Sequence, residues 1–339
     1  MPVSRLSPAP SSIQAGDRID FHMHTRASDG GWRPEQLIDY LAEHDFRVVA
    51  ICDHDTMASV PQAAEQAATR GLHLVPGVEF TTAWDGRQWH LLIYGIDPET
   101  ERGAGFAALL AQQQANLAAA AERGITVLEM HGHQLPSLKE VVDGRALVPT
   151  YVLLTAIKDK HATNLQTAHE LTKKYGEAMR VDMPLASVVK VAHEAGGICI
   201  LAHPGRDDGE GILDADRLDK MLAEIPIDGL EGHYRSYKDD DTEKYRQMAL
   251  SRGLLVSCGS DSHAPGHPVN PRPYRAGWVV PFLDRLGIEV EGFNGVSWQR
   301  GDDAVLAESK TDQPPETSDG EKTPGMVETA AAVISRQRE

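Results

Sequence analysis

The chain has 339 residues, of which 41% are hydrophobic and 24% charged, and this length suits one α/β barrel of about 250 residues with additional segments. The formal net charge of -17 argues against a duplex-DNA-binding surface, and no apolar run is long enough to span a membrane. Three widely spaced cysteines, Cys52, Cys199 and Cys258, do not form a disulfide framework, so we expect a cytoplasmic protein.

The two ends of the chain differ in composition from its middle. Residues 1–17 are rich in Ser, Pro and Ala and are expected to form a flexible arm. Residues 299–339 are polar, acidic and proline-bearing, which is typical of a disordered tail. The folded part is therefore expected between residues 18 and 298.

Within residues 18–298, short apolar runs alternate with amphipathic helical patterns. Helices are predicted at residues 33–45, 60–71 and 184–197. Strands alternating with helices favour a parallel sheet, and their number favours a barrel over an open sheet. The runs predicted as strands are rich in β-branched residues and bounded by Gly, Pro and Asp: RIDFHMH, RVVAICDHD, LHLVPGVEFTT, QWHLLIYGI, GGICILAHP, DGLEGHY and LLVSCGSDSH.

Residues from about 100 to 185 interrupt this alternation. Their composition is mostly helical, as in FAALLAQQQANLAAAAERG and LVPTYVLLTAIKDKHATNLQTAHELTKKYG. We therefore expect a mostly helical insertion beside the mouth of the barrel.

Residue types that bind metals stand at the ends of the predicted strands. The first strand ends in His22 and His24 and the last in Asp261 and His263, and a spacing of two places both members of each pair on one face. The carboxyl ends of the strands of a parallel barrel converge at one mouth, so these side chains would meet there. Nine candidate ligands follow: His22, His24, Asp29, His54, Glu79, His90, His203, Asp261 and His263.

This set of side chains favours a metal centre over isolated surface or core histidines. One histidine at a strand end is usually an ordinary residue, but a whole set in register with the strand ends is hard to obtain by chance. Imidazoles mixed with carboxylates suit Zn, Mn or Fe better than Ca or Mg, and bridging carboxylates would let nine ligands hold two or three ions. Without metal, the converging carboxylates are expected to repel one another and to have raised pKa values.

Five blocks in this order, FHMHTRASDG, ICDHD, GVEF, LAHPG and GSDSH, resemble those of the polymerase-and-histidinol-phosphatase (PHP) family of metal-dependent phosphoesterases. The resemblance covers roughly residues 18–280. It implies a distorted seven-stranded, TIM-like β/α barrel with a trinuclear centre at its mouth. The metal would be manganese in first place, with iron or zinc as alternatives, and all nine ligand positions are filled.

One branch of the family is the most similar. Asp29, within SDG, and the helical insertion resemble the branch that includes 3′,5′-nucleoside bisphosphate phosphatases and a 5′-to-3′ trimming exoribonuclease. The branch has a GRPH-like segment near the substrate phosphate, whereas this chain has Arg145 within Gly144-Arg145-Ala146-Leu147. This departure concerns the substrate more than the chemistry.

The implied reaction is hydrolysis of a phosphoester. Clustered ions would lower the pKa of bound water toward about 7, so that a metal-bridging hydroxide attacks phosphorus in line. His263 or His267 would protonate the leaving oxygen. Four further residues flank the ligands and would either orient them or serve only as turn or cap residues: Asp55, Asp53, Ser260 and Ser262. Phosphate contacts are expected from four residues, each of which could instead be a solvated surface group: Arg206, His233, Arg235 and Arg145.

The expected substrate is a small phosphorylated metabolite, in first place a nucleoside 3′,5′-bisphosphate. The alternatives are a 5′-3′ exoribonuclease that trims short RNA ends and a histidinol-phosphate-type phosphatase. A long RNA groove would be basic and lined with aromatic residues, and the charge of -17 with 6% aromatic residues argues mildly against one. A metal-dependent C–N hydrolase commonly uses a carboxylated lysine, and no predicted strand ends in Lys.

Overall fold

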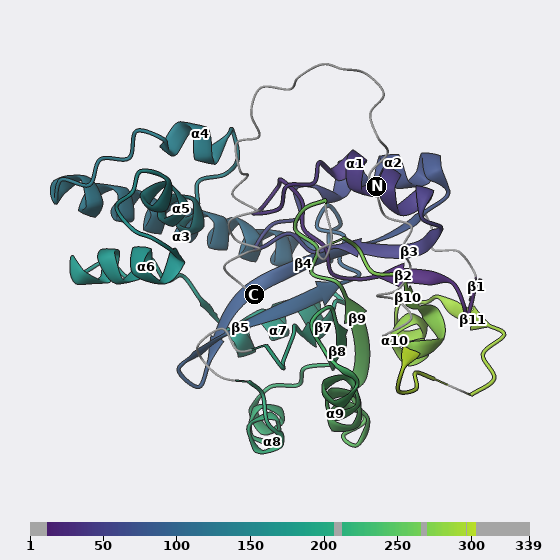
Figure 1. Ribbon diagram of the computed structural model, residues 1–339. Coiled ribbons are helices and arrows are strands. Elements are labelled where there is room, and N and C mark those ends of the chain that lie inside the picture. The colour runs from purple at the N-terminus through teal and green to yellow at the C-terminus, as the bar shows by residue number, and fades with distance from the viewer. Residues whose placement is uncertain (1–11, 207–211, 266–269, 296, 303–339) are drawn as a thin grey trace.

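A nearly closed, barrel-shaped sheet forms the centre of the computed structural model, which describes residues 12–206, 212–265, 270–295 and 297–302 (Figure 1). All seven predicted strands are present: β2 (Arg18–Asp20), β3 (Phe46–Ile51), β4 (His73–Trp84), β5 (Arg87–Tyr94), β7 (Ile198–Leu201), β8 (Gly229–Tyr234) and β9 (Leu255–Gly259). The short strand β10 (Tyr274–Arg275) lies beside β2. The backbone N–H of Phe21, just after β2, donates to the carbonyl of Cys258 in β9 at 3.2 Å, and Met23 bridges to Ser262, so the last strand approaches the first.

The three predicted helices are also present, as α1 (Pro34–Glu43), α2 (Val60–Arg70) and α7 (Leu185–Glu194). The helix α1 begins with a proline in its first turn and buries one apolar face, as expected for a helix lying on a sheet. No helix in the described ranges is long and apolar enough to cross a membrane. The remaining elements of the barrel are α8 (Ala215–Glu224), α9 (Asp239–Leu250), η1 (Ala276–Trp278) and α10 (Val280–Arg285).

The expectation of a purely parallel sheet is wrong at β5. This strand pairs antiparallel with both β4 and β7, while the neighbouring pairs β3·β4 and β7·β8 are parallel. The cause is the two-residue turn Asp85–Gly86, whose φ values of 52° and 74° suit a tight hairpin. Because β5 runs in the reverse direction, His90 reaches the mouth of the barrel from within the strand, opposite Thr81.

The segment between β5 and β7 is helical, as predicted. Its helices gather at one side of the barrel in Figure 1, and they enclose an apolar cluster of their own that includes Leu128, Val152 and Met179. The short strand β6 (Met183–Pro184) returns the chain to the barrel by pairing with β4. The helices are α3 (Ala104–Met130), α4 (Leu138–Val142), α5 (Pro149–Lys158) and α6 (Leu165–Lys174).

The predicted N-terminal arm needs one correction. Residues at its end form β1 (Ser12–Gln14), which pairs in parallel with β11 (Glu289–Glu291). The reason is local: Ile13 is 3% exposed and packs into the main core, so an apolar side chain in a polar stretch anchors the strand. Residues 1–11 of the arm and residues 303–339 of the tail lie outside the described residues.

Candidate metal centre

The nine predicted ligands meet at one mouth of the barrel, around the carboxylate of Glu79. Glu79 lies in the middle of β4 and is 1% exposed. Burial of a carboxylate is costly unless cations or hydrogen-bond donors surround it, and here the surrounding groups are imidazoles. Its oxygens lie 3.0–3.3 Å from ring nitrogens of five histidines: His22, His24, His54, His90 and His203.

Asp261 contributes a second carboxylate to the same side of the cluster. Its Oδ1 lies 3.1 Å from Nε2 of His24 and 3.6 Å from Nε2 of His22. The donor atoms of these three residues and Glu79 all lie within 4.8 Å of one another. Asp261 follows β9 with a φ of 52°, a left-handed conformation that non-glycine residues adopt at an energetic cost and that often marks a functional position.

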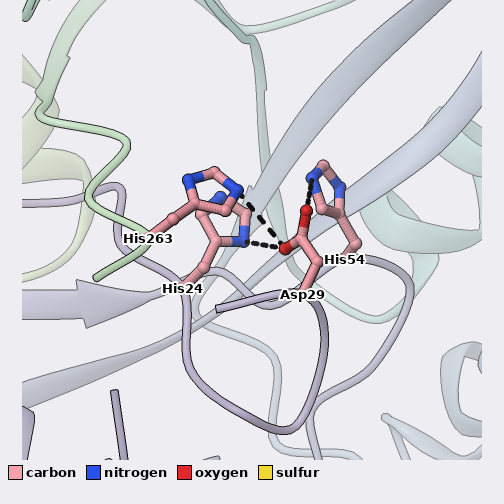
Figure 2. Close-up of side chains that lie close together, drawn as sticks. All are labelled: His24, Asp29, His54 and His263. Atoms are coloured by element: carbon pink, nitrogen blue, oxygen red, sulfur yellow. Dashed lines mark ion pairs between the residues drawn. The ribbon is translucent and has the colours of Figure 1, made fainter. Parts of the chain in front are cut away.

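Asp29 forms the centre of a second group, shown in Figure 2. Its Oδ1 lies 3.3 Å from Nε2 of His263 and 3.8 Å from Nδ1 of His24, and its Oδ2 lies 3.9 Å from Nε2 of His54. The three imidazoles turn toward this carboxylate from different segments of the chain (Figure 2). A third group consists of His54, Glu79 and His90, so the groups overlap at His24, His54 and Glu79.

The side chains present fit divalent metal ions. Nε2 of His22 and Nε2 of His24 lie 3.1 Å apart. Two ligand atoms bound to one ion at about 2.1 Å are themselves roughly 3.0–3.4 Å apart. Nδ1 of His24 and Nε2 of His263 are buried without a hydrogen-bond partner among the described residues, which leaves them available as donors to an ion.

Hydrogen bonds on the far side of two imidazoles also fix the tautomer that a metal requires. Nδ1 of His22 lies 2.9 Å from Oε1 of Glu231, and Nδ1 of His263 lies 3.0 Å from the carbonyl oxygen of Asp261. When each Nδ1–H donates to these oxygens, Nε2 carries the lone pair and faces the cluster. This carboxylate- or carbonyl-backed arrangement is typical of metal-binding histidines.

The acidic ligands have lowered pKa values, contrary to the expectation from mutual repulsion. Burial alone would raise the pKa of Glu79, but His54, His22 and the other imidazoles lower it well below its usual value. Burial would likewise raise the pKa values of Asp29 and Asp261, but positive groups lower both well below their usual value. The largest lowering effect comes from His263 at Asp29, and from His263 and Arg235 at Asp261. The carboxylates are thus separated by imidazoles rather than placed against one another.

The ligand histidines differ in the direction of their pKa shifts. Burial would lower the pKa of His22, yet Glu79, Glu231 and Asp261 raise it well above its usual value, and nearby carboxylates raise that of His24 to about 9. Burial lowers the pKa of His54 to about 3 and also lowers that of His203. Without metal, these raised pKa values favour a protonated His22 and His24 pair, whose positive charge would balance the buried carboxylates.

Polar residues behind the ligands hold them in place. Asp53 accepts hydrogen bonds from the backbone and hydroxyl of Thr25 at 2.6 and 2.7 Å and from the hydroxyl of Ser28 at 2.7 Å, so it organises the loop before Asp29. Ser262 accepts a hydrogen bond from the indole of Trp32 at 3.1 Å. Both were predicted as orienting residues or as turn residues, and the orienting role stays a prediction.

Asp55 has a similar position behind the ligands. Its carboxylate accepts hydrogen bonds from the backbone N–H and the hydroxyl of Thr81, at 2.8 and 2.7 Å, and burial raises its pKa to about 6. These contacts tie the turn after β3 to β4 and explain an orienting role. The direct catalytic role of Asp55 stays a prediction.

Glu231 and Asp20 are site residues that the sequence analysis missed. Besides its contact with His22, Glu231 accepts a hydrogen bond from the backbone N–H of His203 at 2.7 Å. Asp20 accepts from the backbone N–H groups of Ser260 and Arg272 at 3.0 and 2.9 Å. The available signal was an acidic residue inside each of two otherwise apolar strands, RIDF and GLEG.

Two of the predicted phosphate-binding arginines lie beside the ligand cluster. The guanidinium of Arg206 is 3.4 Å and that of Arg235 is 3.7 Å from Oδ2 of Asp261, and the hydroxyl of Tyr234 donates to the same oxygen at 2.8 Å. Arg145 instead lies in the insertion, with its guanidinium 4.5 Å from the ring centroid of Tyr151. His267 lies outside the described residues.

The prediction for His233 is wrong. This residue is fully buried, receives a hydrogen bond from Arg246 at 2.8 Å and stacks on Trp278 with 5.2 Å between ring centroids. Regular alternation would place it on the same face as Glu231, but the pairing of β8 with β9 shifts register between these two residues. That irregularity turns His233 toward α9 and away from the ligands.

Comparisons with known proteins agree with the interpretation of this mouth as a metal site. The sequence model of the PHP domain family matches residues 20–182. A 3′,5′-nucleoside bisphosphate phosphatase of Chromobacterium violaceum is 32% identical over 257 residues, covering 73% of this chain and 88% of that protein. The 5′-3′ exoribonuclease Rnm of Salmonella typhimurium is 30% identical over 262 residues, covering 73% and 85%. A solved structure from Bifidobacterium adolescentis, described as a metal-dependent phosphoesterase, superposes with a TM-score of 0.62 at 25% identity, covering 75% of this chain and 91% of that one.

Proposed function

The chain belongs to the PHP domain family and is a metal-dependent phosphoesterase, and on this basis we propose that its substrate is a nucleoside 3′,5′-bisphosphate. The observation that carries the proposal is the pair Arg206 and Arg235 at the edge of the ligand cluster. A bisphosphate presents two anionic groups, one for the metal centre and one for these cations. The similarity to a phosphatase of that name supports the same substrate class.

The proposal includes two to three divalent ions in the three overlapping donor groups, manganese in first place and iron or zinc as alternatives. Ions held there would lower the pKa of water toward about 7 and neutralise charge on the phosphate oxygens. Glu79 contributes to two of the groups, so its loss would affect more than one ion.

Residues of the chain bind and orient the substrate. Arg206 and Arg235 are mostly buried, and their charges are partly neutralised by Asp261, so a phosphate oxygen can become a further acceptor for them. The Nδ1–H of His263 donates to a carbonyl, which favours a ligand role for its Nε2 over the role of proton donor. The assignment of His267 as the proton donor to the leaving oxygen stays a prediction.

Trimming of RNA 5′ ends is the second candidate, because a relative of similar identity is named as a 5′-3′ exoribonuclease. Such an activity would use the same centre on a longer substrate. We expect neither duplex DNA nor a membrane as a partner. We also propose a cytoplasmic location, which three buried free cysteines support: Cys52, Cys199 and Cys258.

Hydrolysis of a panel of substrates, followed as inorganic phosphate for the monoesters and also as released nucleotide for RNA, tests the proposal. The Mn-loaded protein is assayed with adenosine 3′,5′-bisphosphate, AMP, histidinol phosphate and a short 5′-phosphorylated RNA. We expect kcat/KM for the bisphosphate to exceed that for AMP by about tenfold or more, since a charged hydrogen bond contributes about 1.5–3 kcal/mol. Arg206→Ala should remove most of this preference while retaining AMP hydrolysis.

The variants and substrates separate the alternatives. Asp261→Ala should abolish hydrolysis of every substrate, because it removes a metal ligand. Nucleotide release from RNA with no activity on the bisphosphate would replace the proposal with the exoribonuclease. Equal rates on the bisphosphate and AMP, unchanged in Arg206→Ala, would contradict the substrate assignment.

A further inference from the structure

The helical insertion contacts the backbone that carries a metal ligand. Tyr151, on α5, is 1% exposed and packs with Val141 and Leu154 in a small apolar cluster of the insertion. Its hydroxyl donates a hydrogen bond to the backbone carbonyl of Ser28. Ser28 immediately precedes Asp29, so this hydrogen bond joins the insertion to the ligand loop.

Tyr151 is itself held in a fixed position. The guanidinium of Arg145 lies 4.5 Å from its ring centroid, within the range of a cation–π interaction. That guanidinium donates to the carbonyl oxygens of Val141 and Val142 at 2.7 and 3.0 Å, so it cannot move freely. The Tyr151 hydroxyl therefore approaches Ser28 from a rigid element and loses little conformational entropy in making the contact.

Two further contacts join the insertion to the same part of the mouth. Arg26, three residues before Asp29, forms an ion pair with Asp143, which follows α4. The side-chain amide of Gln114, on α3, donates to the backbone carbonyl of Asp55 at 2.6 Å. The insertion thus contacts both ligand-bearing loops, and of its three side chains that do so Tyr151 is the most buried.

The position of Asp29 depends on the backbone at Ser28. Its carboxylate lies 3.3–3.9 Å from the nitrogens of His263, His24 and His54, so a displacement of the loop would separate these donors. Because metal–ligand distances vary by only about 0.2 Å in a working site, small displacements weaken binding. From this geometry we infer that Tyr151 is a positioning residue that fixes Asp29 and sets the affinity of the ion bound by the Asp29 group.

Titration of chelator-treated protein with Mn²⁺, followed by the EPR signal of free Mn²⁺, tests this inference. Tyr151→Phe keeps the ring, its packing and the cation–π contact with Arg145, and removes the hydroxyl together with its hydrogen bonds to Ser28 and the Arg145 side chain. We expect one class of bound Mn²⁺ to weaken about tenfold, because loss of an outer partner of a ligand typically costs 10–100-fold in affinity, while the other classes stay unchanged. Phosphoesterase activity should fall at limiting Mn²⁺ and recover at saturating Mn²⁺.

Tyr245→Phe is the matched control. Its hydroxyl is buried in the same way and donates to the backbone carbonyl of Leu213 at 3.3 Å, but it does not contact the Asp29 loop. We expect wild-type Mn²⁺ binding for this variant. Identical binding curves for wild type and Tyr151→Phe would overturn the inference, as would a weakening of all classes shared with Tyr245→Phe. The inference rests on the metal centre, and because binding is measured without substrate, its outcome is independent of which phosphoester is cleaved.

Discussion

Glu79 and its histidines show how single residues carry the chemistry of this mouth. A fully buried carboxylate surrounded by five imidazoles is stable without metal only if some of those imidazoles are protonated. The raised pKa values of His22 and His24 provide such protons, and a metal ion provides the same positive charge. Proton and metal therefore compete for the same nitrogens.

This competition predicts that metal binding releases protons. The pKa of His24 in the folded protein is about 9, above its ordinary value of 6.5, so its proton stabilises the metal-free fold below pH 6.5 and this contribution is lost as the pH rises through about 9. Calorimetry of Mn²⁺ binding at pH 7, in buffers of different ionisation enthalpy, should show proton release from the His22 and His24 pair. Affinity should rise with pH up to about 9; pH-independent binding without proton release would contradict this description.

Residue identities predicted most of the site. Most ligands were visible because they stand at or shortly after strand ends, where topology brings distant segments together, whereas Glu79 and His90 lie inside β4 and β5. Glu231 and Asp20 were missed, because an acidic residue inside an apolar strand is a weak signal without a distinguishing spacing. His233 was misplaced because a register shift within β8 leaves no mark in the sequence.

At the scale of elements, the hairpin between β4 and β5 positions the site most directly. Its register places His90 opposite Thr81, two residues from Glu79, so an antiparallel strand supplies a ligand at a mouth otherwise built from parallel strand ends. The turn Asp85–Gly86 was readable in the sequence as an Asp-Gly pair between two apolar runs, which is a strong hairpin signal. The parallel prediction failed because the helix–strand alternation elsewhere outweighed that local signal.

Two glycine substitutions test the role of this turn. Gly86 has a φ of 74° and an added Cβ there would meet no atom within 4 Å, so Gly86→Ala should destabilise the fold by about 1 kcal/mol through backbone strain alone. Gly105, within α3, has equal space, and Gly105→Ala should stabilise by about 0.5–1 kcal/mol. Urea unfolding of both variants measures the difference, and shifts of the same sign would contradict the turn assignment.

At the scale of the whole molecule, the metal centre connects segments from the first to the last strand of the barrel at one mouth. Its ligands come from the segment after β2, the ends of β3, β7 and β9, and the interiors of β4 and β5. The segments after β2 and β9 meet at the approach of the last strand to the first, where Met23 bridges to Ser262. Bound ions are therefore expected to stabilise the barrel where its sheet is least continuous.

Removal of metal should lower the melting temperature. A ligand at 100 times its Kd stabilises the folded state by about 2.7 kcal/mol, which corresponds to roughly 4 °C for a chain of this size. Chelator-treated protein should regain this increment on addition of Mn²⁺, whereas Glu79→Gln should show little Mn²⁺ dependence. Melting temperatures that are equal with and without Mn²⁺ would show that the centre does not contribute to the stability of the barrel.

The overall architecture was predictable because the hydrophobic periodicity of the sequence matches the observed strands and helices along most of the barrel. The strand β1 was not, because three residues in a polar arm carry too little pattern, and their partners in β11 lie 277 positions away. The attachment of the insertion to the Asp29 loop was also unpredictable, since Tyr151 and Ser28 are 123 residues apart and Tyr151 belongs to none of the five blocks.

Anomalous scattering from crystals grown with Mn²⁺, recorded at the manganese absorption edge, tests the central claim most directly. The account predicts two or three peaks at the mouth of the barrel, each within about 2.0–2.3 Å of donor atoms of the Glu79, Asp261 and Asp29 groups. Absence of peaks there, or peaks confined to acidic surface residues such as those at the start of α9, would contradict the assignment of this mouth as a metal centre.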